Sequence, residues 1–211
     1  MSVPTMRSRR LDYSESTRSA LVDSAVELFT KRGYAGTSLD EVAKRARVTK
    51  GALYHHFSGK QALFEAAFEQ VESLVYDRLQ KIMTGDGEPW ERAMGGLQAF
   101  IRSCLDPSYQ RIAIHEGPVV MGWERWREAE EQSSFGLVRS GLQLLVDAGE
   151  VEPVPVDLTA RLLFGALSSA ATEIAGAADP KKVGAEIEDV ITRMLSRLRR
   201  PAGHEERPAA G

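Results

Sequence analysis

Residues 38–57 carry the sequence SLDEVAKRARVTKGALYHHF, which predicts two short helices joined by a tight turn. Ser38 and Glu41 match the S-x-x-E capping box, and apolar residues follow at the i, i+3, i+4, i+7 spacing of a one-faced helix. After a break, Leu53 and Phe57 stand one turn apart on the same face of a second helix. Two short helices connected in this way form a helix-turn-helix unit.

The second helix of this unit has an outer face that suits a nucleic-acid groove. A helix turns by about 100° per residue, so burying Leu53 leaves the small, aromatic and basic side chains outside. Gly51 and Ala52 allow a close approach to a groove floor, and Tyr54 and His55 can donate hydrogen bonds. Backbone amides at a helix start also favour a phosphate. The predicted DNA-binding residues are Thr37, Ser38, Thr49, Lys50, Gly51, Ala52, Tyr54, His55 and Lys60.

Helix caps, aromatic residues and a final lysine follow one another in a defined order between about residues 16 and 63. The ordered elements are Thr37-Ser38, Val42-Ala43, Val48-Thr49-Lys50-Gly51-Ala52-Leu53-Tyr54-His55-His56-Phe57 and Lys60 to Leu63. This pattern resembles the DNA-binding domain of the TetR family of bacterial transcriptional repressors. Arg47 departs from it, because a glycine is common at that position in relatives and tolerates a left-handed backbone better.

Charge is unevenly distributed along the chain of 211 residues. The formal net charge is −3, but residues 1–60 hold 11 Lys and Arg against 6 Asp and Glu, a net +5. Residues 61–211 hold the remaining 16 against 24, a net −8. A basic head on an acidic body is what a DNA-binding protein with a separate sensing or pairing part needs, although chance unevenness of a solvated surface gives the same figures.

The composition, 43% hydrophobic and 27% charged residues, is typical of a soluble globular protein. The single cysteine, Cys104, excludes an intramolecular disulfide and a cysteine metal cluster, which suits a reducing cytoplasm. No apolar segment of an export signal follows Arg9 and Arg10, and the longest apolar stretch, residues 162–172, is too short to span a membrane. We therefore expect a cytoplasmic protein with no membrane partner, no cofactor and no metal.

Periodicity and breaks divide the chain into four parts. Residues 1–13 lack apolar periodicity and predict a flexible basic arm, either solvated or reaching toward DNA. Residues 14–62 form the helix-turn-helix DNA-binding domain, and residues 63–200 a larger helical ligand-binding and dimerisation domain. Residues 201–211 predict a disordered tail. No alternating strand pattern persists, so the predicted fold is all-α, with three N-terminal helices followed by a helical body.

Several helices are expected in this arrangement. Their predicted ranges are residues 16–32, 59–82, 90–105, 108–115 and 119–148, followed by one opened by Asp157 and a last one after Asp179-Pro180. The long helix that starts near residue 59 spans both the DNA-binding part and the body, as the transmission of a movement requires.

The last two predicted helices carry unusually many small residues and a wide apolar stripe. Such helices can form a four-helix bundle across a two-fold axis, although periodicity alone fits ordinary core helices equally well. The family resemblance implies the dimer, since relatives dimerise through their last two long helices. The predicted interface residues are Leu162, Gly165, Ala166, Ser169, Ile187, Val190, Ile191, Met194 and Leu198.

Large side chains gather in segments between the Gly-Pro breaks in the middle of the chain. They predict either a ligand pocket or plain core. The candidate ligand-binding residues are Phe100, Cys104, His115, Met121, Trp123, Trp126 and Phe135. His115-Glu116 with Cys104 is the one cluster that resembles a catalytic pair, but E-x-x-H, H-E-x-x-H, P-loop and G-x-S-x-G motifs are absent. We therefore assign no catalytic residues and expect a protein that is not an enzyme.

The combined prediction is a ligand-responsive transcriptional repressor that binds a pseudo-palindromic double-stranded DNA operator as a homodimer. By the family resemblance, an unidentified small-molecule effector in the body releases it from DNA. The alternative is a helical ligand-binding or protein-interaction module that no longer reads DNA. A helical-bundle enzyme is a weaker third hypothesis.

Overall fold

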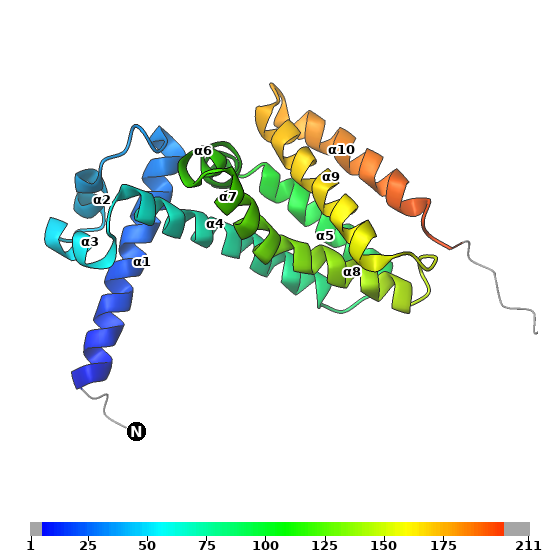
Figure 1. Cartoon of the computed structure of the whole chain (residues 1–211), viewed down its shortest axis with the longest axis horizontal. Coiled ribbons are helices and arrows are strands. Elements are labelled where there is room, and N and C mark those ends of the chain that lie inside the picture. The colour runs from blue at the N-terminus through cyan, green and yellow to red at the C-terminus, as the bar shows by residue number, and fades with distance from the viewer. Residues whose placement is uncertain (1–5, 201–211) are drawn as a thin grey trace, which may run out of the picture. The chain divides into compact units, whose positions relative to one another are not determined.

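The computed structural model describes the backbone of residues 6–200 and, apart from residue 133, the side chains of residues 14–200. The regular elements in this part of the chain are helices, accompanied by one isolated antiparallel bridge between Val151 and Arg199 (Figure 1). The all-α prediction is confirmed. Within the same residues, no helix is long and apolar enough to cross a membrane.

The described residues form two compact units. The first unit holds residues up to Val75 together with Leu105–Glu130, and the second holds Tyr76–Cys104 and the residues from Glu131 onward. The continuous helix α4 (Lys60–Met83) contributes to both units. This division follows compactness, whereas the predicted boundary after residue 62 separates functions, and that boundary stays a prediction.

The first unit contains the predicted helix-turn-helix. Besides the first part of α4, its elements are α1 (Met6–Arg32), α2 (Leu39–Arg45), α3 (Lys50–His56), the π-helix η1 (Tyr109–Glu116), α6 (Gly117–Met121) and α7 (Trp123–Glu130). Helix α1 begins earlier than the sequence predicted, so the backbone of residues 6–13 is helical where a flexible arm was expected. Residues 1–5 of the predicted arm lie outside the described residues, as does the predicted tail.

Three aromatic rings join α1, the loop that follows it and α4 in the core of the first unit. The ring of Phe64 lies edge-on to Phe29 at 5.3 Å and to Tyr34 at 5.3 Å between centroids. Phe29 and Phe64 are fully buried. Edge-to-face contacts of this kind add to the free energy gained by burying the rings, so this cluster fixes α4 against α1.

The second unit is a helical bundle. Besides the end of α4, its elements are α5 (Pro89–Cys104), the short π-helix η2 (Glu131–Phe135), α8 (Gly136–Asp147), α9 (Val156–Gly176) and α10 (Pro180–Ser196). Asp179 caps α10 by accepting a hydrogen bond from the Lys182 amide, as its sequence position predicts. Figure 1 shows α9 and α10 side by side, and they also pack against each other in the contact pattern.

Glycines allow the helices of the second unit to come close together around Met83. A Cβ atom on Gly96 would stand 2.8 Å from the Met83 sulfur, and one on Gly141 would stand 2.6 Å from its methyl carbon. A larger side chain at either position would therefore require the end of the Met83 side chain to move. The glycines in these two helices serve packing rather than turns.

The structure breaks one predicted helix into several pieces. The sequence predicts a single helix over residues 119–148, but Gly122 has a backbone φ of 86° and ends α6. Helix α7, η2 and α8 then follow. The predicted helix over residues 108–115 is confirmed in place, but its main part is the π-helix η1. A π-helix closes its backbone hydrogen bonds one residue later than an α-helix, and η1 is too short for apolar periodicity to distinguish the two.

Candidate nucleic-acid interface

The turn between α2 and α3 closes with the hydrogen-bond pattern of a Schellman cap. The amide of Arg47 donates to the Lys44 carbonyl at 3.2 Å, and the amide of Val48 donates to the Ala43 carbonyl at 3.0 Å. Arg47 has a φ of 58°, the left-handed region that this cap requires. The left-handed position of this turn, which glycine normally occupies, is therefore occupied here by an arginine.

The capping residues predicted for the two short helices are present. Ser38 accepts a hydrogen bond from the Glu41 amide, and the Glu41 carboxylate accepts from the Ser38 amide, so the capping box is complete. Thr49 caps α3 by accepting a hydrogen bond from the Ala52 amide at 3.2 Å. These caps fix the start of both helices and the direction in which α3 leaves the turn.

Helix α3 buries one face and exposes the other as the sequence predicts. Leu53 is fully buried and Phe57 is buried, whereas Tyr54 is 50% exposed. Gly51 and His55 are exposed on the same helix, and Ala52 is half-buried. A Cβ atom on Gly51 would meet nothing closer than the Thr49 hydroxyl at 3.9 Å, so the surface there is open. This face combines small side chains with hydrogen-bond donors.

Two lysines predicted to contact phosphate already have weak partners. Lys50 forms an exposed ion pair with Asp40 at 2.7 Å, and the hydrogen bond with that carboxylate raises the pKa of Lys50. The Lys60 ammonium lies 4.4 Å from the centroid of the Tyr34 ring. Exposed ion pairs are worth only about 0–1 kcal/mol, so a phosphate can replace Asp40 at small cost.

Thr37 does not share the exposure of the other predicted DNA-binding residues. Its side chain is buried, and its hydroxyl donates a hydrogen bond to the Gly33 carbonyl at 2.9 Å. Ser38, the next residue, is exposed. Thr37 thus stabilises the loop between α1 and α2 from inside and is not part of the exposed surface.

A contact between this loop and η1 was not predicted from the sequence. The Glu116 carboxylate accepts a hydrogen bond from the Tyr34 amide at 2.8 Å and forms an ion pair with Arg111 at 3.1 Å. The space beside Gly33 is filled by these two side chains, since a Cβ atom there would stand 2.3 Å from Arg111. Residues 82 positions apart give no local sequence signal of such a contact. The contact fixes the loop between α1 and α2 against η1.

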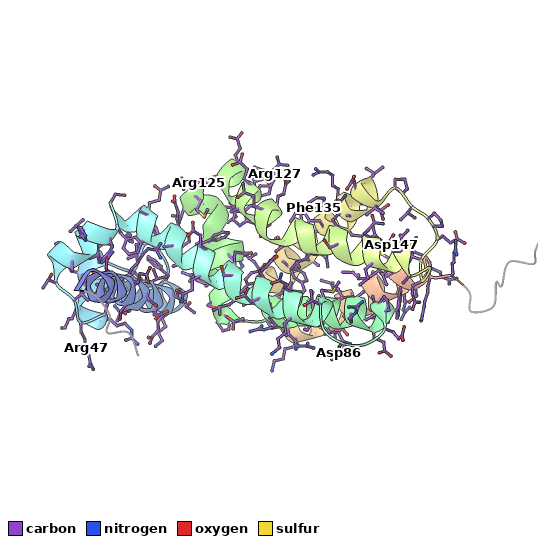
Figure 2. The ribbon with its side chains drawn as sticks, turned by 90° about the horizontal axis from the view of Figure 1, so that it is seen from below. Arg47, Asp86, Arg125, Arg127, Phe135 and Asp147 are labelled. Atoms are coloured by element: carbon purple, nitrogen blue, oxygen red, sulfur yellow. The ribbon has the colours of Figure 1, made fainter. Side chains whose placement is uncertain are left out.

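The seven candidate ligand-binding residues are divided between the two units. Phe100, Cys104 and Phe135 belong to the second unit, and His115, Met121, Trp123 and Trp126 belong to the first. Cys104 and Trp126 are buried, but His115 and Trp123 are exposed. The Trp126 indole donates to the Ala113 carbonyl at 2.9 Å, which satisfies it as a core residue. Phe135, labelled in Figure 2, lies edge-on to Phe164 and under the Arg161 guanidinium.

Most of the predicted dimer residues lie on α9 and α10, with Leu198 just after α10, and several of them form an exposed apolar face. Leu162 is 69% exposed, Val190 55% and Met194 58%. Gly165, Ala166 and Ser169 are exposed on α9, whereas Ile187, Ile191 and Leu198 are half-buried. Leu158, which the sequence analysis did not single out, is also exposed on α9. Large apolar side chains gathered on two neighbouring helices mark a surface that favours association.

Two carboxyl groups lie together in the first unit, which the sequence analysis did not predict. Glu72 on α4 is buried, and Glu130 at the end of α7 is half-buried. Burial raises the pKa of Glu130 to about 8, and the charge of Glu72 adds to the rise. In the described part of the chain, no group of three or more His, Cys, Asp or Glu side chains could hold a metal ion.

The Glu130→Gln variant is expected to be more stable than the wild-type protein at pH 8.5 and to lose part of its pH dependence. A carboxyl group with a raised pKa in the folded state stabilises the fold when protonated, so its contribution is lost as pH rises from about 4.5 through about 8. Each unit of pKa shift corresponds to about 1.4 kcal/mol. Thermal melts between pH 5 and pH 8.5 measure the difference, with the exposed Glu128→Gln as the matched control. Parallel melting curves for both variants and the wild type would contradict the assignment.

Comparison with known proteins identifies relatives of both parts of the chain. Residues 21–67 match the family described as bacterial regulatory proteins, tetR family, and residues 90–198 match the tetracyclin repressor-like C-terminal domain. The chain is 28% identical over 151 residues to the Transposon Tn10 TetC protein of Escherichia coli, covering 72% of this chain and 76% of that protein. It is 28% identical over 147 residues to the HTH-type transcriptional regulator SrpR of Pseudomonas putida, covering 69% and 68%.

A solved structure agrees with the fold over nearly the whole chain. The crystal structure of a TetR-family transcriptional regulator from Pectobacterium atrosepticum superposes with a TM-score of 0.80 at 29% sequence identity. The match covers 90% of this chain and 97% of that one. The similarity therefore extends from the helix-turn-helix through the helical body.

Proposed function

The chain belongs to the TetR family of DNA-binding transcriptional regulators, and we propose that it acts as a homodimeric repressor released by a small molecule. Two helix-turn-helix units would bind successive major grooves of a pseudo-palindromic operator, about 34–36 Å apart. The observation that carries this proposal is the face of α3, where Tyr54, His55 and Gly51 are exposed above a buried Leu53. We assign no reaction to the protein, and its place of action would be the cytoplasm.

The contact surface that we propose is smaller than the sequence prediction. It consists of Ser38, Thr49, Lys50, Gly51, Ala52, Tyr54, His55 and Lys60. The caps orient the backbone, the lysines contribute charge, and Tyr54 and His55 contribute donors toward base edges or phosphates. Buried Thr37 supports the loop that precedes α2.

A footprint on the DNA directly upstream of the protein's own coding sequence tests this function. Two protected half-sites separated by one turn of the double helix are expected, because each protomer presents one α3. Half-sites on one face of the duplex would support the dimer, and a single protected half-site would contradict it. If the protein is folded and binds an effector but protects no DNA at any concentration, the result would favour a module that does not read DNA.

We propose that a second copy of this chain covers the exposed face of α9 and α10. Leu158, Leu162, Val190 and Met194 share this face with the small residues Gly165 and Ala166. A Cβ atom on Gly165 would meet nothing within 4 Å, so a partner helix could approach closely there. Two such helix pairs related by a two-fold axis would bury the face in a four-helix bundle.

The Leu162→Arg variant is expected to be monomeric, near the chain mass of 23.2 kDa, at concentrations where the wild type is a dimer. A two-fold interface would bury the new charge twice without a partner, which weakens dimerisation by roughly a hundredfold or more. Light scattering after size-exclusion chromatography measures the mass. Leu74→Arg changes a similarly exposed leucine on α4 and should leave the dimer intact. A dimeric Leu162→Arg protein would remove this face from the proposal.

The effector site is proposed for the helical body, by analogy with the family. An effector releases DNA only if it binds the DNA-free state more tightly than the DNA-bound state. Phe100, Cys104 and Phe135 of the second unit remain candidates because none of these side chains is exposed. A thermal-shift screen against a metabolite and drug panel, followed by DNA release, tests the site, because a ligand of the folded state raises its stability.

A further inference from the structure

Arg47 occupies a backbone position that disfavours any residue with a side chain. It is the left-handed residue of the cap that ends α2, with a φ of 58°. In the described chain, the other residues with a positive φ are glycines: Gly33, Gly87, Gly122 and Gly149. A side chain at a left-handed position lowers the stability of the fold relative to glycine. Arg47 therefore weakens the very turn that it closes.

Its guanidinium is not used by the protein itself. Exposed ion pairs hold two of the nearby cations, with Arg45 bound to Glu27 and Lys50 bound to Asp40. Within the residues that the structure describes, the Arg47 side chain makes no hydrogen bond, ion pair or ring contact, and it is exposed. Figure 2 shows it extending outward from the ribbon of the first unit. Its positive charge is available for an external anion.

The position of Arg47 relates this charge to the face of α3. It lies two residues before the cap Thr49 and three before Lys50, in the turn that leads directly into α3. The Val48 amide that follows is held by the Ala43 carbonyl, so the backbone at the turn is fixed. A long side chain leaving this turn can reach the phosphates that border a groove occupied by α3.

We propose that Arg47 binds a phosphate of the DNA backbone at the edge of the major groove, a contact that a glycine in this turn cannot make. The proposal rests on the proposed DNA-binding function. The arginine then lowers the stability of the free protein and raises its affinity for any duplex, because a phosphate contact carries no sequence information. These two effects have opposite signs, which separates a DNA contact from a structural role.

The test compares Arg47→Gly, Arg47→Lys and the wild type. Arg47→Gly should melt about 2–4 °C higher, since glycine relieves the left-handed backbone. The same variant should bind DNA roughly three- to tenfold more weakly per protomer near 0.1 M salt, and it should lower the salt slope by about 2, because the dimer loses two phosphate contacts. Arg47→Lys should keep the salt slope, because it retains the charge. Arg102→Ala removes an exposed arginine from α5 of the second unit and serves as the charge-matched control.

Two duplexes serve as probes: the fragment upstream of the protein's own coding sequence and a scrambled fragment of the same length. A phosphate contact predicts the same fold loss on both duplexes for Arg47→Gly. Unchanged affinity and salt slope in Arg47→Gly, with normal binding by the wild type, would overturn the role of Arg47 and leave the proposed function intact. A loss confined to the upstream fragment would also overturn it, in favour of base reading. Failure of the wild type to bind either duplex would overturn both.

Discussion

Replacing Lys50 and Tyr54 together by alanine is expected to reduce operator affinity by roughly a hundredfold or more. A good base contact contributes about 1–3 kcal/mol, a phosphate contact adds to it, and a dimer loses each of them twice. The fold should survive, because Tyr54 is half-exposed and the Lys50–Asp40 ion pair is exposed. Fluorescence anisotropy with the upstream fragment measures affinity, and circular dichroism checks that the helices and the melting temperature are retained.

The matched control for this experiment is Lys182→Ala. Lys182 is an exposed lysine that forms a surface ion pair with Glu186 on α10, outside the first unit. It should leave operator affinity unchanged at equal salt. A double variant of Lys50 and Tyr54 that binds as tightly as the wild type would show that α3 does not face DNA.

Phe64→Ala is expected to lower the free energy of unfolding by about 3–5 kcal/mol. Phe64 is fully buried and lies between Phe29 and Tyr34, so truncation removes two edge-to-face contacts and leaves a cavity. Its ring connects α4 to α1 in the core of the first unit. Urea denaturation followed by circular dichroism measures the change, and DNA binding should fall in parallel as the folded population falls.

Leu74→Ala supplies the control on the same helix. Leu74 is an exposed leucine of α4, and its truncation should change stability by no more than about 0.5 kcal/mol. A loss smaller than about 1 kcal/mol in Phe64→Ala would mean that the aromatic cluster does not hold α4 in place.

Local signals allowed the helix-turn-helix to be predicted in detail. The capping box of Ser38 and Glu41, the cap at Thr49 and the burial of Leu53 all depend on residues within one or two turns. Such features are set by backbone hydrogen bonds and apolar periodicity, which a sequence displays directly. The left-handed turn was more difficult, because an arginine there hides the usual glycine signal.

The body was harder to predict because its features depend on contacts between distant segments. The hydrogen bond from the Tyr34 amide to Glu116 and the proximity of Glu72 and Glu130 join elements far apart in sequence. Apolar periodicity predicted the apolar face of the last two helices. The sequence also made Trp126 a pocket candidate, whereas its indole is buried and donates a hydrogen bond to the Ala113 carbonyl. Burial alone does not distinguish a residue that lines a site from one that packs a core.

The central claim is that the exposed face of α3 binds DNA as part of a dimer. Its most direct test is a titration of the upstream fragment and of a scrambled duplex, measured by fluorescence anisotropy between about 0.05 and 0.3 M salt. We predict affinity for the upstream fragment at least about a thousandfold higher than for the scrambled one. We also predict a linear fall of log affinity with log salt, with a slope of about −0.9 for each phosphate contact. Equal binding to both fragments, or an affinity independent of salt, would contradict the claim.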